Sequence, residues 1–225
     1  MLTSRTLYAA LFALGTLAST ATAQRSRATP GPSIVVGPML GVSFSSLSTS
    51  NEAVGVDIRN RTGFVAGGFV TFNASSHVAV EPQLVYIQKG ATAVTTGTGF
   101  NSITYALDYI QVPVLIKGRY WFGDPNKGLT IDPFIGPAIA FNVHCSISGL
   151  AATASCSSVG TNASSVDISG IFGIGAEYAG LTFQGRYDVS FTDAYDTPNS
   201  PAAPAQNKAK NLAWVLTLGY KFPLR

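Results

Sequence analysis

Acidic, basic and amide side chains are the residues of this sequence that could do chemistry. They occur in segments where polar residues alternate with small or apolar ones. This polar set comprises Glu81, Gln83, Lys89, Gln111, Lys117, Arg119, Glu177, Gln184, Arg186, Asp188 and Lys221. If such a face is enclosed, its charges must be paired or hydrated, because an unpaired buried charge is costly. The set therefore indicates either a binding or conducting lumen, or a structural plug of ion pairs.

Within this set we predict a lumen polar network, which consists of Glu81, Gln83, Lys117, Arg119, Glu177, Arg186 and Asp188. Its acidic and basic members are nearly balanced, which suits mutual pairing better than the rings of like charge that line selective channels. Side chains alone fill the interior of a narrow eight-stranded barrel. We therefore favour the plug, with a conducting lumen as the alternative.

Combinations of residues that could catalyse a reaction are missing from the sequence. A hydrolase needs a nucleophile with a base, or an Asp and His set that activates water. Of the two histidines, His77 falls in a predicted turn and His144 in a predicted loop. The sequence also has no metal-binding motif, phosphate-binding loop or cofactor signature. We predict no catalytic residue, no metal, no cofactor and no enzymatic activity.

The N-terminal residues have the three parts of a secretory signal peptide. Arg5 supplies a positive charge, Leu7–Leu17 a short apolar run and Ala21–Ala23 a cleavage site of small residues. The apolar run is too short for a membrane anchor helix. We predict a signal peptide over residues 1–23, a short lead-in over 24–33 and one folded domain over 34–225.

The two cysteines, Cys145 and Cys156, lie in one predicted loop. An exported chain enters an oxidising compartment, so we predict a local disulfide between them. Such a bond stabilises by about 2–3 kcal/mol. A zinc site is the weaker alternative, because the two cysteines with His144 leave it one ligand short.

Alternation with a period of two defines the elements that position the polar set. In Val166–Tyr178 and Leu181–Phe191, large apolar residues alternate with small, polar or charged ones, and Ala179–Gly180 forms the turn between them. This pattern indicates β-strands, and their length suits a bilayer crossing of roughly 9–11 residues better than the ~5–6 of a soluble strand. A soluble sandwich also alternates, with its apolar face turned inward, so the hairpin alone does not decide.

Six further segments alternate in the same way: Val35–Ser46, Phe64–Phe72, Val78–Lys89, Ile103–Phe122, Ile131–Phe141 and Leu212–Phe222. The long predicted loops are Leu47–Arg61, Gly90–Ser102, Asn142–Ser165 and Asp193–Lys210, and short turns separate them. Bacterial membrane barrels sort short turns to the periplasm and long loops to the outside, whereas a sandwich has no reason to do so. One irregularity remains: Tyr105, Leu107 and Tyr109 have the wrong parity, which predicts a bulge near Asp108–Ile110 or an extension beyond the bilayer.

The composition supports a membrane barrel. Charged residues make up 11% of the chain, well below the ~25% of soluble domains. No apolar run of ~18 or more residues, as a membrane helix requires, occurs in the sequence. The formal charge is +3, and no basic cluster indicates nucleic acid as a partner.

Three segments resemble the bacterial outer-membrane beta-barrel domain family typified by PorT-like proteins. Asp108–Lys117 resembles a strand that runs Tyr, hydrophobe, Glu, hydrophobe, Pro and then apolar residues to Lys, with Gln111 in place of Glu. Glu81–Gly90 is similar to the preceding strand, and Pro133–Pro137 to the fifth. The resemblance covers about Val35 to Phe222, and the final residues differ from the aromatic end that is common in such barrels.

The strand pattern and this resemblance together predict an all-β fold, an eight-stranded antiparallel up-and-down transmembrane β-barrel in the bacterial outer membrane. The resemblance implies little about activity. We expect a non-enzymatic protein that is structural or interacts through its extracellular loops, with a small pore or transporter for solutes as the alternative. Outer-membrane lipid is the expected partner, and extracellular or periplasmic protein partners are not identified by the sequence.

Overall fold

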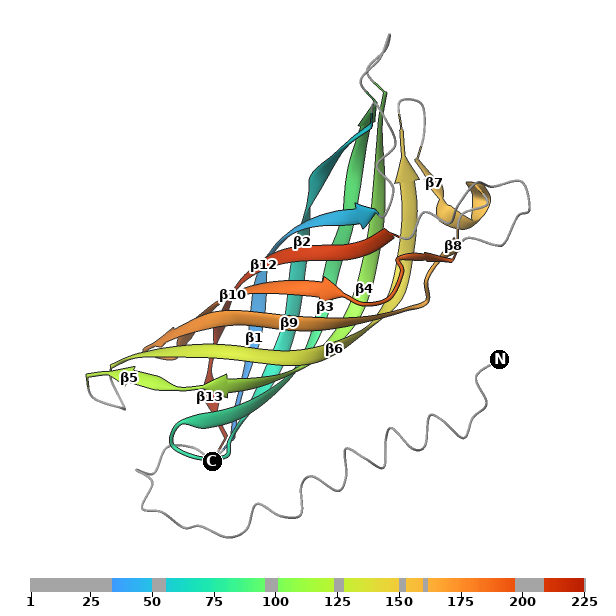
Figure 1. Ribbon diagram of the computed structural model, residues 1–225. Helices are drawn as coiled ribbons and strands as arrows, with labels where there is room; N and C mark the ends of the chain where they lie inside the picture. Colours follow the sequence, from blue (N-terminus) through green and yellow to red (C-terminus); the bar gives the residue numbers. More distant parts are fainter. Residues whose placement is uncertain are drawn as a thin grey trace, which may run out of the picture.

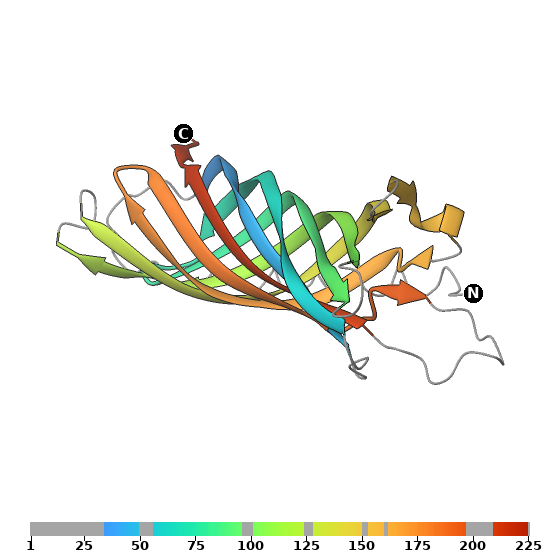
Figure 2. The same ribbon diagram turned by 90° about the horizontal axis from the view of Figure 1, so that it is seen from above.

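The computed structural model describes residues 34–49, 56–95, 101–123, 128–149, 153–159, 162–196 and 209–224. Eight long antiparallel strands close into a barrel within these residues (Figures 1 and 2), which confirms the predicted fold class. They are β1 (Ile34–Thr49), β2 (Val56–Asn73), β3 (Val78–Thr95), β4 (Asn101–Gly118), β6 (Leu129–Ser148), β9 (Val166–Tyr178), β10 (Leu181–Ser190) and β12 (Ala209–Tyr220). Pairing of β1 with β12 closes the ring. The predicted signal peptide and lead-in lie outside the described residues.

Shorter elements complete the chain. They are β5 (Tyr120–Phe122), β7 (Thr153–Ser155), β8 (Asn162–Ala163), β11 (Tyr195–Asp196), β13 (Phe222–Pro223) and the 3-10 helix η1 (Cys156–Val159). Strands β5 and β7 pair with β6, β13 pairs with β1, and β8 with β11 forms a separate two-stranded ribbon. Among the described residues, no helix has the length and apolar character needed to cross a membrane.

Large apolar side chains cover the outside of the barrel, as the alternation predicts. Leu84 is 60% exposed and Ile135 is 64% exposed, and in the last strand Trp214, Leu216 and Leu218 also face outward. Water would make so wide an apolar surface unfavourable, whereas the hydrocarbon of a bilayer accommodates it. The outer face of the barrel is therefore its lipid-facing surface, and the polar residues of the same strands point inward.

Several strands are longer than the alternation indicates, so parts of the predicted long loops are wrong. Strand β2 already begins at Val56, β3 continues to Thr95 and β6 to Ser148. Figure 1 shows β3 and β4 rising past the ends of β10 and β12. Beyond the lipid an outward side chain need not be apolar, so a strand can continue there without the pattern that reveals it.

The irregularity near Asp108 has a different cause from the one predicted. The pairing of β4 with β6 does shift between Asp108 and Tyr109, but the extra residue is Val143 in β6. The bulge therefore lies in the partner strand, and the alternation within β4 continues unbroken. As a consequence Leu107 and Tyr109 point into the barrel, where both are fully buried.

Candidate functional site

The interior of the barrel is filled by polar and apolar side chains in layers. We call the end with the short connections the turn end and the opposite end the loop end. At the turn end, Arg119 lies 3.1 Å from Glu177 (Nη2 to Oε2) and 3.6 Å from Asp132 (Nε to Oδ1). Arg119 also donates a 2.7 Å hydrogen bond to Asn73 Oδ1, and Lys221 forms an ion pair with Glu177. These contacts join β2, β6, β9 and the segments that follow β4 and β12.

Glu81 on β3 is the centre of the next layer. Its Oε2 lies 2.7 Å from Lys117 Nζ and accepts a 2.7 Å hydrogen bond from the Thr71 hydroxyl. Its Oε1 accepts bonds of 2.9 Å from both Gln83 and Gln184. Since Glu81 is fully buried, these donors replace the water that a carboxylate otherwise requires.

Arg186 on β10 spans the middle of the interior. It donates from Nη1 to Gln83 Oε1 and from Nη2 to Gln111 Oε1, both at 2.9 Å. Its Nε lies 3.1 Å from Asp188 Oδ1 on its own strand. Only 2% of Arg186 is exposed, so the barrel encloses the guanidinium, and its hydrogen bonds connect β10 with β3 and β4.

Lys89 and Asp167 form the polar layer nearest the loop end. Lys89 Nζ lies 3.6 Å from Asp167 Oδ2 and 3.9 Å from Asp188 Oδ2, and the side chain of Lys89 is fully buried. The Asp167 carboxylate accepts 2.8 Å hydrogen bonds from the Ser190 and Thr192 hydroxyls. This layer ties β3 to β9 and β10.

Acids and bases are balanced within each half of the interior. Near the turn end, Glu81, Asp132 and Glu177 face Lys117, Arg119 and Lys221, and higher up Asp167 and Asp188 face Lys89 and Arg186. A local excess of one sign is therefore absent among these described groups, unlike in the charged rings of selective channels. No group of three or more His, Cys, Asp or Glu side chains within the described ranges could hold a metal ion.

All members of the predicted lumen polar network lie inside the barrel and take part in these contacts. The other members of the wider polar set, such as Lys89 and Lys221, join them. The predicted polar set did not include Asp132 and Asp167, which are both buried. Strand parity was the signal that could have found them, because Pro133 and Ile168 next to them face the lipid side.

An apolar cluster runs along the interior beside the charged layers and extends to the loop end. Its buried members include Leu47, Ala91, Leu107 and Ala209, and the ribbon formed by β8 and β11 covers it. Residues next to the ribbon anchor it. Ala194 donates a 2.7 Å backbone hydrogen bond to the carbonyl of Ala209 and accepts one of 2.9 Å from Ser164. At the loop end itself the interior is thus lined mainly by apolar side chains.

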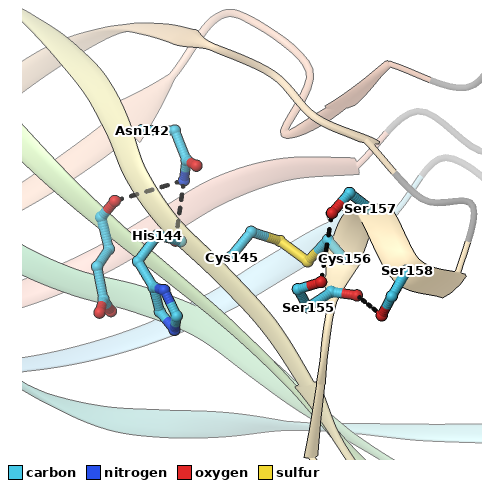
Figure 3. Close-up of a disulfide and its surroundings, with 8 residues drawn as sticks. Asn142, His144, Cys145, Ser155, Cys156, Ser157 and Ser158 are labelled. Atoms are coloured by element: carbon cyan, nitrogen blue, oxygen red, sulfur yellow. Dashed lines mark hydrogen bonds between the residues drawn. A yellow bond between two sulfur atoms is a disulfide. The ribbon is translucent and has the colours of Figure 1, made fainter.

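The cysteines and histidines lie away from the charged interior. Cys145 on β6 and Cys156 at the start of η1 form a disulfide, with Cα atoms 5.5 Å apart (Figure 3). His144, next to Cys145 in the chain, is exposed. The bond joins the wall strand β6 to η1 at the loop end. His77 lies in the turn between β2 and β3, where its ring packs edge-on at 5.0 Å from Trp121. Neither histidine therefore contributes to the interior layers.

A polar girdle interrupts the apolar outer wall just where the strands begin to extend past it. Its members are Arg61, Tyr86, Gln88 and Asp108. The Tyr86 hydroxyl donates to Asp108 Oδ2 at 2.8 Å, and Arg61 lies 3.9 Å from Asp108 Oδ1. Two register shifts lie at this level. Beside the first, Gln88 accepts a hydrogen bond from the Phe64 amide, and beside the second, Asn142 of β6 donates one to the Asp108 carbonyl.

The girdle marks the level at which the outer face stops being hydrocarbon-like. Above it polar side chains appear on the outward face, for example Thr92 and Thr104, whose hydroxyls are 3.0 Å apart. Below it, two shallow apolar hollows of about 660 and 760 Å³ lie on the outer wall and not in the lumen. Ile135 and Trp214 line the first, and Leu84 and Phe222 the second. These hollows face lipid, since Ile135, Trp214 and Leu84 belong to the lipid-facing surface.

Comparison with known protein families gives one decisive match. Residues 22–196, well over half of the chain, match the family described as "Outer membrane protein beta-barrel domain". The match does not single out the PorT-like proteins within it. No curated protein matches the sequence.

Solved structures with a similar fold include three small outer-membrane proteins. Ail, the attachment invasion locus protein of Yersinia pestis, solved with the heparin analogue sucrose octasulfate, is 14% identical over 84% of this chain and 99% of its own, with a TM-score of 0.42. OprG from Pseudomonas aeruginosa is 16% identical over 85% and 95%, with a TM-score of 0.46. Neisserial surface protein A is 11% identical over 86% and 100%, with a TM-score of 0.44. At these values they carry no functional argument.

Proposed function

Because this chain belongs to the outer membrane protein beta-barrel domain family and resides in the bacterial outer membrane, we propose that it is a non-enzymatic barrel with a plugged lumen. Its role is structural, or it binds partners through the elements on its extracellular side. Following the rule for bacterial barrels, the turn end faces the periplasm and the loop end the outside.

The observation that carries this proposal is the position of Arg186. Its guanidinium reaches from β10 to Gln83 on β3 and Gln111 on β4. Hydrogen bonds across the bore at that level support a filled lumen, because the interior of an eight-stranded barrel is just wide enough for side chains to fill. The balanced charges above and below Arg186 also favour mutual pairing over ion transport.

The extracellular part of the proposal is supported by the wall beyond the polar girdle. Strands β3 and β4 continue for about seven residues past Gln88 and Asp108, to Thr95 and from Asn101. At about 3.3 Å per residue, this wall rises roughly 20 Å above the girdle. A rigid sheet at that height can present the loops to proteins or surfaces outside the cell.

Planar-bilayer recording of the purified protein tests the plug. We expect no steady, large conductance, and the same result for Arg59→Ala, which removes an exposed charge outside the lumen. A reproducible open channel whose ion selectivity shifts in Arg186→Ala would contradict the proposal. It would favour instead a small pore or transporter for solutes.

Capture of partners tests the extracellular role. Intact cells that display the protein would be cross-linked at the surface, and the attached proteins identified. We expect specific partners that are lost when the β3–β4 connection is shortened, while the barrel still assembles. If the variant with the shortened connection captured the same partners, the extension of β3 and β4 would have no role in binding them.

A further inference from the structure

The ribbon of β8 and β11 is held over the loop-end cluster by few non-covalent restraints. The ribbon itself contains two residue pairs, Tyr195 with Ala163 and Asp196 with Asn162. Two-stranded ribbons are marginally stable in water even when they are longer. Ala163 nevertheless packs against the buried cluster, and Ala194 beside the ribbon is 1% exposed. Something further must keep this cover in place.

The Cys145–Cys156 disulfide lies at the other end of the covering segment. Strand β7 pairs with β6 through three positions, of which Ser146 with Ser155 is the last. The disulfide joins the next pair of residues in the same register, Cys145 and Cys156, so it links the two strands where β7 ends. Helix η1 starts at Cys156 and contacts both β6 and β8. Figure 3 shows the bond joining the wall strand to η1.

We propose that this disulfide is a redox-sensitive clamp that holds β7, η1 and β8 as a cover over the apolar cluster at the extracellular mouth. A dithiol such as dithiothreitol opens it by exchange. One thiolate of the reagent attacks a cystine sulfur and displaces the other cysteine as a thiolate, which takes up a proton. The second thiol of the reagent then displaces the remaining cysteine, giving two free thiols and the cyclic disulfide of the reagent.

Loss of the bond leaves the short pairings of β7 and β8 and the packing of Ala163 to hold this cover, so β7, η1 and β8 open away from the loop end. The barrel beneath is unaffected, because its strands are joined by long ladders and by the interior ion pairs. The clamp therefore controls a surface and does not gate a channel. It is independent of the proposed function, since a closed lumen neither requires it nor follows from it.

Hydrogen–deuterium exchange of the full protein in lipid nanodiscs tests the clamp. The oxidised and dithiothreitol-reduced forms would be compared after mass spectrometry has verified two free thiols. We expect amides of residues 153–163 to exchange roughly tenfold faster or more after reduction, since exchange follows local opening. Amides of Thr182–Ser190 in the barrel wall serve as the internal reference and should not change.

The double variant Cys145→Ser, Cys156→Ser supplies the matched control. It should show the fast exchange without any reductant and no response when the reductant is added. Unchanged exchange over residues 153–163 in the fully reduced protein would overturn the proposal. Equal acceleration of Thr182–Ser190 would overturn it as well, because the disulfide would then hold the barrel and not its cover.

Discussion

Arg186 is the residue whose removal should damage the interior most. It is almost completely buried and connects β10 with β3 and β4. The change Arg186→Ala leaves the Asp188 carboxylate without its 3.1 Å partner. Breaking a buried ion pair on one side costs about 3–5 kcal/mol. We expect the free energy of unfolding in lipid vesicles to fall by that order, measured by urea titration.

The control for this prediction is an ion pair on the outside of the extension. Arg59 and Asp57 lie 3.4 Å apart, and their side chains are 66% and 58% exposed. Exposed pairs contribute at most about 1 kcal/mol, so Arg59→Ala should change stability little. Equal losses of unfolding free energy in Arg186→Ala and Arg59→Ala would show that the interior ion pairs are hydrated.

Leu216 tests the assignment of the lipid-facing surface. It lies in the middle of β12 with its side chain directed outward, between Trp214 and Leu218. The change Leu216→Arg should hinder assembly by about 2–4 kcal/mol if the site is near the bilayer midplane. Leu216→Met keeps the surface apolar and should assemble normally. Equal folding yields of both variants into vesicles would show that this position does not contact hydrocarbon.

At the scale of the elements, the polar girdle should coincide with the outer edge of the membrane. Ser102 and Ile116 lie on the outward face of the same strand, β4, on opposite sides of Asp108. In intact cells, a charged maleimide should react with Ser102→Cys and leave Ile116→Cys unlabelled. The oxidised native cysteines do not compete for the reagent. Labelling of Ile116→Cys would place the bilayer elsewhere on the wall.

Lipid explains why most strands could be predicted from the sequence and why their ends could not. Where hydrocarbon surrounds the barrel, each outward residue must be apolar, so segments such as Leu212–Phe222 alternate clearly. Above the girdle water surrounds both faces of the wall, and this requirement disappears. The residues from Val56 to Asn60 consequently read as a loop although they pair with β3. Residues 90–95 were missed for the same reason.

The interior network was only partly predictable, because pairing depends on which strands meet across the bore. Alternation identifies the face on which Glu81 or Arg186 lies. It gives no information on the partner, as when Gln184 reaches Glu81 from a strand 103 residues away in sequence. Asp132 and Asp167 were left out of the predicted set although their strand parity places both on the inward face. The bulge at Val143 was likewise invisible in its own strand and was ascribed to the neighbouring one.

At the scale of the whole molecule, two different solvents shape the same strands. The lipid-facing surface of the barrel is apolar, while the interior holds ten charged groups that pair with one another. The loop end adds an apolar cluster beneath the ribbon of β8 and β11. The barrel therefore combines an apolar outer surface, a buried polar interior and a wall of β3 and β4 that continues past the polar girdle.

The paired interior has a consequence for how faithfully the chain assembles. A slip of one strand by two residues keeps every apolar side chain toward the lipid, so the outer surface cannot detect the error. The same slip separates Glu81 from Lys117 and leaves both charges unpaired in a buried position. The ion pairs thus favour the native register of the strands over shifted ones. A barrel carrying Glu81→Gln and Lys117→Met should still insert but populate more than one register, seen as doubled backbone resonances in NMR spectra. A single set of resonances would show that the turns alone fix the alignment.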